Sequence, residues 1–211
     1  MIDFYTWTTP NGRKVAIMLE EVGVPYNARP IDIGQDEQHT SEFLKISPNN
    51  KIPAIVDHDN GMSLMESGAI LMYLAEKTGQ LMPSSGEAKW QVTEWLMMQM
   101  GSVGPMLGQT HHFAFYNPGK SAYAEERYLK ENARIYGVLD KRLGEGQYLA
   151  GDYSIADIAT WPWIARHPRQ QMSLFEYPNL LRWYLEIAAR PAVQRGYIVP
   201  KHVEDIPVPE K

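Results

Sequence analysis

The chain has 211 residues, of which 44% are apolar, and this length and composition suit two small packed domains. Its net charge of -5, with basic residues scattered along the chain, excludes the concentrated positive surface that nucleic acid requires. Cysteine is absent, which excludes disulfide bonds, thiolate metal sites and a nucleophilic thiol of the protein's own, so any thiol chemistry must use a thiol that a ligand brings.

The first 80 residues alternate between strand and helix patterns. We expect, in order, a strand over 2–7, a helix over 13–22, a strand over 26–33, a short helix starting at Ser41, a pair of strands within 52–66 and a helix over 68–77. The two paired strands are joined at Asn60-Gly61, where glycine supplies the positive φ of a tight hairpin. This order predicts an α/β thioredoxin-like domain over residues 1–80, an open sheet with helices on both faces.

Strand patterns disappear beyond residues 79–87, a segment that contains Gly, Pro and Ser. Apolar residues at spacings of three and four predict helices over 87–100, 122–143 and 179–190, of which the last precedes a proline-rich tail. A further helix follows Ser154, because Ser154 and Asp157 are close to the pattern of a capping box. We therefore predict an all-helical domain over 87–211, in which 203–211 forms an extended strap on the surface.

The sequence lacks a membrane-spanning segment, a secretory signal and a recognisable metal-binding motif. No stretch approaches about 20 apolar residues, and the first residues lack the pattern of a secretory signal, so we expect a cytoplasmic protein without membrane association. His111 and His112 are adjacent, but no third ligand has a zinc-like spacing, and neighbours on a helix point about 100° apart. We therefore expect structural or pocket-lining histidines and no metal.

Three short motifs of the first domain suggest ligand binding. "NNKIPAIV" places Pro53 at the start of a strand, and a cis Ile52–Pro53 bond would turn the Ile52 backbone toward an extended peptide ligand. "MESGAI" places Glu66 and Ser67 at a helix N-terminus, where free N–H groups and the helix dipole attract a carboxylate. "TTPNG", residues 8–12, occupies the turn where many small α/β folds keep a reactive group, yet it holds no Cys, Ser or Tyr. Taken singly, the three motifs are also typical of a trans proline, a capping pair and a plain turn.

With these motifs in place, the chain resembles a glutathione transferase. "SPNNKIPAIVD" and "ESGAILMYLAEKTG" are similar to that family's glutathione-binding hallmark, and "YSIADIATWPW" is similar to the capping motif of its helical domain. "TWTTPNGRKVAIMLEE", "GPMLGQTHHF" and the absence of a catalytic Tyr, Ser or Cys resemble the bacterial Nu class, the disulfide-bond reductase type. The resemblance covers nearly the whole chain.

The resemblance implies a set of site residues. Thr9 and Asn11 would hold the glutathione sulfur through hydroxyl and amide hydrogen bonds. Other parts of glutathione would contact the Ile52 backbone next to Pro53, Glu66 with Ser67 at the γ-glutamyl group, Gln38 at the glycyl end, and Arg127 across a dimer interface. As alternatives, Arg127 is a solvated charge or an i,i+4 partner of Glu131. Tyr5, near the place where some relatives carry a catalytic Tyr, fits the sheet core better.

The resemblance implies that the protein activates the thiol of bound glutathione. A free cysteine thiol has a pKa of about 8.5, and donors near the sulfur, together with the positive end of a helix, raise the thiolate fraction. We expect glutathione-dependent disulfide reduction by a homodimer, with peroxidase action on organic hydroperoxides and with reduced or oxidised glutathione as the bound co-substrate. Two alternatives stay open: a conjugating transferase, in which the thiolate attacks an electrophile, and a non-catalytic protein that binds apolar ligands.

Overall fold

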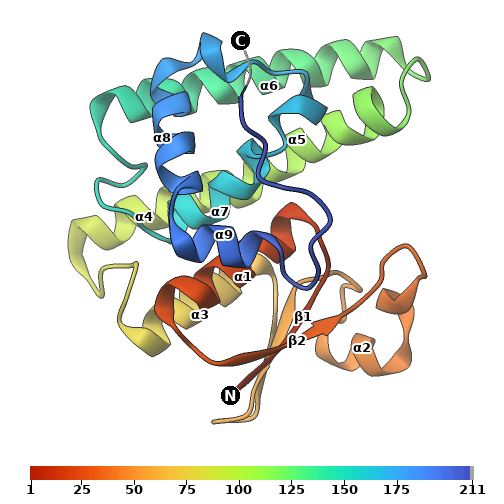
Figure 1. Cartoon of the computed structure of the whole chain (residues 1–211), viewed down its shortest axis with the longest axis vertical. Coiled ribbons are helices and arrows are strands. Elements are labelled where there is room, and N and C mark those ends of the chain that lie inside the picture. Colours follow the sequence, from red (N-terminus) through yellow and green to blue (C-terminus); the bar gives the residue numbers. More distant parts are fainter. Residues whose placement is uncertain (210–211) are drawn as a thin grey trace. The chain divides into compact units, whose positions relative to one another are not determined.

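The structure is a computed structural model that describes residues 1–209, and the chain forms two compact units. Unit 1 comprises Met1–Ser84 and Ala189–Ile206, and unit 2 comprises Ser85–Ala188 and the chain from Pro207 onward. Figure 1 shows the course of the chain through the elements of each unit. The two units are described separately below.

Unit 1 is built around a four-stranded sheet in the order β2-β1-β3-β4. Its elements in chain order are β1 (Ile2–Thr6), α1 (Pro10–Val22), β2 (Tyr26–Pro30), the 3-10 turn η1 (Glu37–His39), α2 (Ser41–Ile46), β3 (Ala54–Asp57), β4 (Met62–Met65), α3 (Ser67–Thr78) and α9 (Pro191–Tyr197). β1 pairs in parallel with β2 and antiparallel with β3, which pairs antiparallel with β4. Figure 1 shows α1 and α3 on one side of the sheet and α2 on the other. The predicted α/β thioredoxin-like fold is confirmed.

Local chemistry explains where α1 and the hairpin lie. Helix α1 begins at Pro10, a residue favoured at the first helical position, and ends at Gly23, which adopts the left-handed conformation with φ 67°. Its apolar face is fully buried, and Val15, Ile17, Met18 and Leu19 are each at most 1% exposed. The predicted hairpin is present between β3 and β4, and Gly61 has the expected positive φ of 72°.

Helix α9 was not predicted, because Pro191 and Gly196 both indicate a helix end when they are read in a proline-rich tail. In the structure, Pro191 occupies the first turn, where proline is favoured, and α9 packs against α1. Gly196 permits this packing, because a Cβ atom there would lie 2.7 Å from the backbone N and Cα of Ile17. Unit 1 therefore includes residues 189–206, which lie within the range 87–211 that the sequence assigned to the helical domain.

Unit 2 is helical, as predicted. Its elements are α4 (Gly86–Met98), the π-helical η2 (Gln99–Val103), α5 (Gly104–Thr110), the π-helical η3 (His111–Tyr116), α6 (Ala122–Glu145), α7 (Ile155–Ile164), the 3-10 turns η4 (His167–Gln170) and η5 (Leu174–Glu176), and α8 (Pro178–Ala188). The bounds of the helices over 101–116 could not be predicted, because Gly and Pro interrupt the periodicity and the π-helical turns shift the spacing of the apolar residues.

The start of α7 holds a buried cluster of hydrogen bonds in the core of unit 2. Ser154 and Asp157 form the predicted capping box, and both are buried. The Asp157 carboxylate accepts hydrogen bonds from the backbone N–H groups of Leu149 and Ser154, from the Ser154 hydroxyl and from the indole N–H of Trp183, at 2.8–3.2 Å. Burial raises the pKa of Asp157 to about 6, although the four hydrogen bonds stabilise the charged form and act to lower the pKa.

The chain after α9 has no helix or strand within residues 203–209, in line with the expected strap, whose last residues, 210–211, lie outside the described part. Arg13, 1% exposed, holds this segment to unit 1: its guanidinium lies 3.5 Å from the Tyr197 ring centroid and pairs with Glu204 at 3.1 Å. Across residues 1–209 we find no helix with both the length and the apolar character needed to span a membrane.

Candidate functional site

The sheet register brings the predicted motifs of unit 1 to one end of the sheet. Tyr5 lies opposite Ala54, and Ala54 lies opposite Met65. The TTPNG turn that follows β1, the Ile52–Pro53 segment that precedes β3 and the Glu66–Ser67 pair that follows β4 therefore meet at this end. These three motifs are far apart in sequence, and the antiparallel pairing of β3 with both neighbours is what gathers them.

The TTPNG turn forms the N-terminus of α1. Thr9 is the N-cap, and its hydroxyl oxygen accepts the backbone N–H of Gly12 at 3.2 Å, which leaves the hydroxyl proton able to donate to a ligand. Asn11 lies in the first turn and is half-buried. Gly12 is required for close packing, because a Cβ atom there would lie 2.4 Å from both the Thr6 hydroxyl oxygen and the Trp7 carbonyl oxygen.

Gly12→Ala is expected to lower the free energy of unfolding by about 2 kcal/mol, since the methyl group forces α1 away from the end of β1. Urea unfolding measures the change. Gly137→Ala is the matched control: on α6 a Cβ atom at this position would have no atom within 4 Å, and removing a helical glycine there should stabilise the protein by about 0.5–1 kcal/mol. Equal effects at the two positions would contradict the packing argument.

The Ile52–Pro53 segment presents unpaired backbone groups. The peptide bond is cis, Pro53 is buried and Ile52 is half-buried. Within residues 1–209, the N–H and C=O of Ile52 form no hydrogen bond with another residue. An extended ligand can therefore pair with this segment as an added strand.

Glu66 and Ser67 form the start of α3. Glu66 is exposed and has a φ of 70°, a sparsely populated conformation for a residue other than glycine that is common at functional sites. Its carboxylate accepts a hydrogen bond from the amide of Asn49 at 3.4 Å. Ser67 is buried, and its hydroxyl oxygen accepts a hydrogen bond from the Lys14 ammonium group at 3.3 Å.

Gln38 lies on η1, on the connection from β2 to α2. The carboxyl end of β2 is at the same end of the sheet as the other motifs, since Pro30 pairs with Thr6 in the parallel register. The amide nitrogen of Gln38 donates to Asp36 at 3.4 Å, and the amide oxygen is buried without a hydrogen-bond partner among residues 1–209. Because the amide nitrogen carries two N–H groups and Asp36 accepts one of them, the other can donate to a ligand.

Lys14 is the residue at this end of unit 1 that the sequence reasoning missed. It lies on α1, is 1% exposed, and burial lowers the pKa of Lys14 to about 7 while the nearby Glu66 charge opposes that shift. A signal was present in the sequence: Lys14 precedes Ile17 and Met18 by three and four residues, which puts it on the apolar face of the helix. A lysine is rarely buried, and this one contacts a predicted ligand-binding residue.

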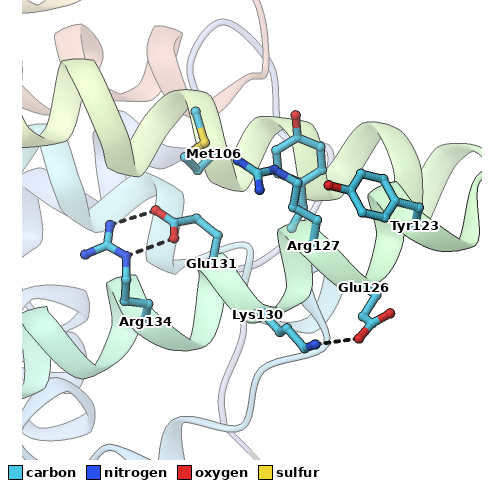
Figure 2. A pocket seen from close by; sticks show the side chains of 8 residues that line it. Met106, Tyr123, Glu126, Arg127, Lys130, Glu131 and Arg134 are labelled. Carbon is cyan, nitrogen blue, oxygen red and sulfur yellow. Dashed lines mark hydrogen bonds and ion pairs between the residues drawn. The ribbon is translucent and has the colours of Figure 1, made fainter.

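Arg127 lies in unit 2, on α6, and is exposed. It lines a pocket of about 560 Å³ together with Tyr123 and Met106 (Figure 2). The i,i+4 pairing with Glu131, which the sequence left as an alternative, is not observed: Glu131 binds Arg134 through two hydrogen bonds of 2.7 and 2.8 Å. Among the described residues, Arg127 makes no hydrogen bond or ion pair of its own.

The two remaining candidates have structural contacts. His111 stacks on Trp163 with ring centroids 5.8 Å apart, and burial, aided by the charges of Arg166 and Arg169, lowers the pKa of His111 to about 4. No group of three or more His, Cys, Asp or Glu side chains within residues 1–209 is arranged to hold a metal ion. Tyr5 is half-buried on β1 and its ring packs against Phe43.

Comparison with known families accounts for both units. Residues 2–76 match the family model described as "Glutathione S-transferase, N-terminal domain", and residues 102–191 match "Glutathione S-transferase, C-terminal domain". The chain belongs to the glutathione S-transferase family. Among curated relatives of this transferase, the disulfide-bond oxidoreductase YfcG of Escherichia coli strain K12 is 50% identical over 204 residues, which cover 94% of this chain and 95% of YfcG. The disulfide-bond oxidoreductase YghU of the same organism is 39% identical, with coverage of 94% and 74%.

Solved glutathione transferase structures resemble this transferase along nearly its whole length. A glutathione transferase from Pseudomonas putida, with one glutathione disulfide bound per subunit, is 42% identical with a TM-score of 0.90, and the match covers 94% of this chain and 91% of that one. A glutathione transferase from Burkholderia graminis, with two glutathione molecules bound per subunit, is 41% identical with a TM-score of 0.90 and coverage of 96% and 89%. The roles of the individual site residues in this transferase stay predictions.

Proposed function

We propose that this protein is a glutathione-dependent disulfide reductase that uses no thiol of its own. The observation that carries the proposal is the TTPNG turn, a helix N-terminus at the same end of the sheet as the unpaired Ile52 backbone. In this turn the Thr9 hydroxyl oxygen accepts the Gly12 N–H, so the hydroxyl keeps its own proton for a ligand. The chain has no cysteine, so the reactive sulfur must be that of a ligand. The names of YfcG and YghU, and the ligands in the related structures, support the same conclusion.

In the proposed complex, glutathione lies along the end of the sheet. Its cysteinyl part pairs with the Ile52 backbone beside Pro53, and its γ-glutamyl carboxylate binds at Ser67 and the start of α3. The γ-glutamyl ammonium group binds the exposed Glu66 carboxylate. The glycyl end reaches the amide nitrogen of Gln38. This arrangement points the sulfur toward the TTPNG turn.

The TTPNG turn activates the sulfur without removing its proton directly. The Thr9 hydroxyl and the Asn11 amide donate hydrogen bonds to the thiolate, and the positive end of the α1 dipole favours its negative charge. Both effects stabilise the charged form and so lower the pKa of the bound thiol. A larger thiolate fraction at neutral pH then raises the rate of disulfide exchange.

The proposed reaction consumes two glutathione molecules. The first thiolate attacks one sulfur of the substrate disulfide, the disulfide bond breaks, and the released thiolate takes up a proton. A second glutathione thiolate then attacks the glutathione sulfur of the mixed disulfide, which yields glutathione disulfide and the second substrate thiol. The substrate is reduced by two electrons and the two glutathiones are oxidised by two.

We propose that the protein acts as a symmetric homodimer in the cytoplasm, with Arg127 of one subunit bound to a carboxylate of glutathione held by the other. The exposed guanidinium of Arg127 supports this role, because other charged side chains of its pocket are already paired: Glu131 with Arg134, and Glu126 with Lys130 (Figure 2).

We also propose peroxidase activity by the same thiolate. The thiolate attacks a hydroperoxide to give an alcohol and a sulfenic acid, and a second glutathione converts the sulfenic acid to the disulfide and water.

Arg127→Ala is expected to raise the KM for glutathione about tenfold and leave the dimer intact, because the variant loses one charge-assisted hydrogen bond to the ligand. Steady-state kinetics and sedimentation measure the two properties. Arg134→Ala is the matched control, since that guanidinium on the same helix is already paired with Glu131. An unchanged KM in Arg127→Ala would return Arg127 to the solvated charge that the sequence left as an alternative.

A comparison of substrates tests the proposed function against its two rivals. Wild-type protein is given glutathione with a small model disulfide, with an aromatic halide and with an organic hydroperoxide. Glutathione disulfide is followed through glutathione reductase and NADPH for the disulfide and the hydroperoxide, and the absorbance of the aryl conjugate is followed for the halide. The proposal predicts fast disulfide reduction and at most weak attack on the halide. Fast halide conjugation without disulfide reduction would make the protein a conjugating transferase. Tight ligand binding with no turnover on any substrate would make it a carrier.

A further inference from the structure

A buried cation lies directly behind the proposed γ-glutamyl subsite. Lys14 is on the second turn of α1, is 1% exposed, and donates a hydrogen bond to the Ser67 hydroxyl oxygen at 3.3 Å. Ser67 is the first residue of α3, so this contact joins the N-terminal part of α1 to the N-terminus of α3. The proposed function uses Ser67 as a ligand but gives Lys14 no role.

The charged groups of the elements that pack against α1 differ in whether they act on Lys14. Helices α3 and α9 pack against α1, and from α3 the carboxylate of Glu66 faces Lys14 closely enough to favour its charged form. Arg190, the N-cap of α9, pairs with Glu21, and Arg195 within α9 pairs with Glu20, both on the last turns of α1. Desolvation nevertheless dominates and lowers the pKa of Lys14 to about 7.

We propose that Lys14 is the positioning residue of the carboxylate subsite: its ammonium group orients the Ser67 hydroxyl toward the ligand and supplies the positive charge that a bound carboxylate requires, so that carboxylate binding takes up a proton. The proposal rests on the proposed function, because it assumes that glutathione binds at Ser67.

The protonation state of Lys14 decides what Ser67 can do. An ammonium group has only donors, so the Ser67 oxygen must accept from it, and the hydroxyl proton then points away from Lys14. A neutral amine has a lone pair that accepts the hydroxyl proton, and Ser67 then cannot donate to the ligand. A carboxylate at Ser67 therefore favours the ammonium form and raises the pKa of Lys14.

The expected result is binding coupled to protonation. At pH 7 Lys14 is about half protonated when free, so saturating binding takes up about half a proton per site. The sign follows from a pKa that is higher in the complex: affinity is greatest below pH 7 and falls as pH rises, by about tenfold between pH 6 and pH 8.

The test is titration calorimetry with S-methylglutathione, whose sulfur cannot ionise and so contributes no proton of its own. Binding is measured at pH 5.5, 7 and 8 in pairs of buffers with different ionisation enthalpies, for wild type, Lys14→Met and Lys141→Met. Lys14→Met has nearly the volume of lysine and removes a buried charge, so it should fold, and its thermal unfolding is checked beside the wild type. Lys141→Met removes an exposed lysine on α6 as the matched control.

A second ligand tests whether the proton uptake depends on the α-carboxylate of the γ-glutamyl group. The S-methyl analogue that lacks the α-carboxylate of the γ-glutamyl group has no partner for the Lys14 charge. We expect wild type and Lys141→Met to take up about half a proton with S-methylglutathione at pH 7, and to take up almost none at pH 5.5 or with the decarboxylated analogue. Lys14→Met should show no uptake, and its affinity should be weaker for S-methylglutathione but equal to that of wild type for the analogue.

The outcomes separate this proposal from the proposed function. If wild type binds S-methylglutathione without proton uptake, or if Lys14→Met takes up as much as wild type, the role of Lys14 is overturned and the glutathione site stands. If Lys14→Met weakens both ligands equally, Lys14 is a structural residue and the proposal fails. If wild type does not bind S-methylglutathione, the proposed glutathione site fails, and the role of Lys14 fails with it.

Discussion

Asp157→Ala is expected to lower the free energy of unfolding by about 4 kcal/mol. The substitution removes a buried carboxylate that accepts four hydrogen bonds, including those from Leu149, Ser154 and Trp183. Each buried donor that loses its acceptor costs about 1–3 kcal/mol, and the lost helix cap adds about 1 kcal/mol. These costs are partly shared because the donors can rearrange together. Urea unfolding followed by circular dichroism measures the loss.

Two companion variants make this prediction specific. Asp152→Ala replaces an exposed aspartate close in sequence and should change stability by no more than about 0.5 kcal/mol. Asp157→Asn keeps the shape but places an NH₂ group against N–H donors, so it should lose about half as much as the alanine variant. A loss below about 1 kcal/mol in Asp157→Ala would show that the four donors find other partners and that the cluster at the start of α7 is not essential.

The double variant Thr9→Ala with Asn11→Ala is expected to reduce kcat/KM for a model disulfide by at least tenfold, which corresponds to about 1.4 kcal/mol of transition-state stabilisation. Both side chains donate to the glutathione thiolate in the proposed mechanism, so their loss lowers the fraction of reactive sulfur. Thr9→Ser keeps the hydroxyl and should keep most of the activity. The assay couples glutathione disulfide to NADPH through glutathione reductase.

A second N-cap shows whether Thr9 acts through the stability of its helix or through the bound thiol. Thr40 caps α2 in the same way that Thr9 caps α1, accepting a backbone N–H from Phe43. Thr40→Ala should therefore cost about the same stability as Thr9→Ala, about 1 kcal/mol, without a tenfold loss of activity. Equal activity losses in the two variants would show that Thr9 acts only through the stability of unit 1.

Local chemistry made most of the fold predictable. Asn60-Gly61 locates a hairpin, Ser154 and Asp157 locate the start of α7, and the apolar face of α1 lies where its spacing indicates. Each of these signals is contained within a few neighbouring residues, so the rest of the chain is not needed to read it.

The features that the sequence did not reveal depend on tertiary contacts. Pro191 and Gly196 resemble the end of a helix, and only the close approach of α9 to the backbone at Ile17 explains why glycine is needed there. The burial of Lys14 depends on its packing beneath α3 and its contact with Ser67, 53 residues away. The motifs of the site were recognisable one by one, but their convergence follows from the sheet register and not from any local pattern.

The central claim is that the TTPNG turn activates a thiol that the protein borrows, and the pKa of the bound glutathione thiol tests it most directly. Because the chain has no cysteine, the ultraviolet absorbance of thiolate in the complex reports the ligand alone. We expect the thiol to titrate at least about one pH unit below its ordinary value of about 8.5 in the wild-type complex, and near that value in the double variant of Thr9 and Asn11. A thiol that titrates at its ordinary value in the wild-type complex would contradict the account.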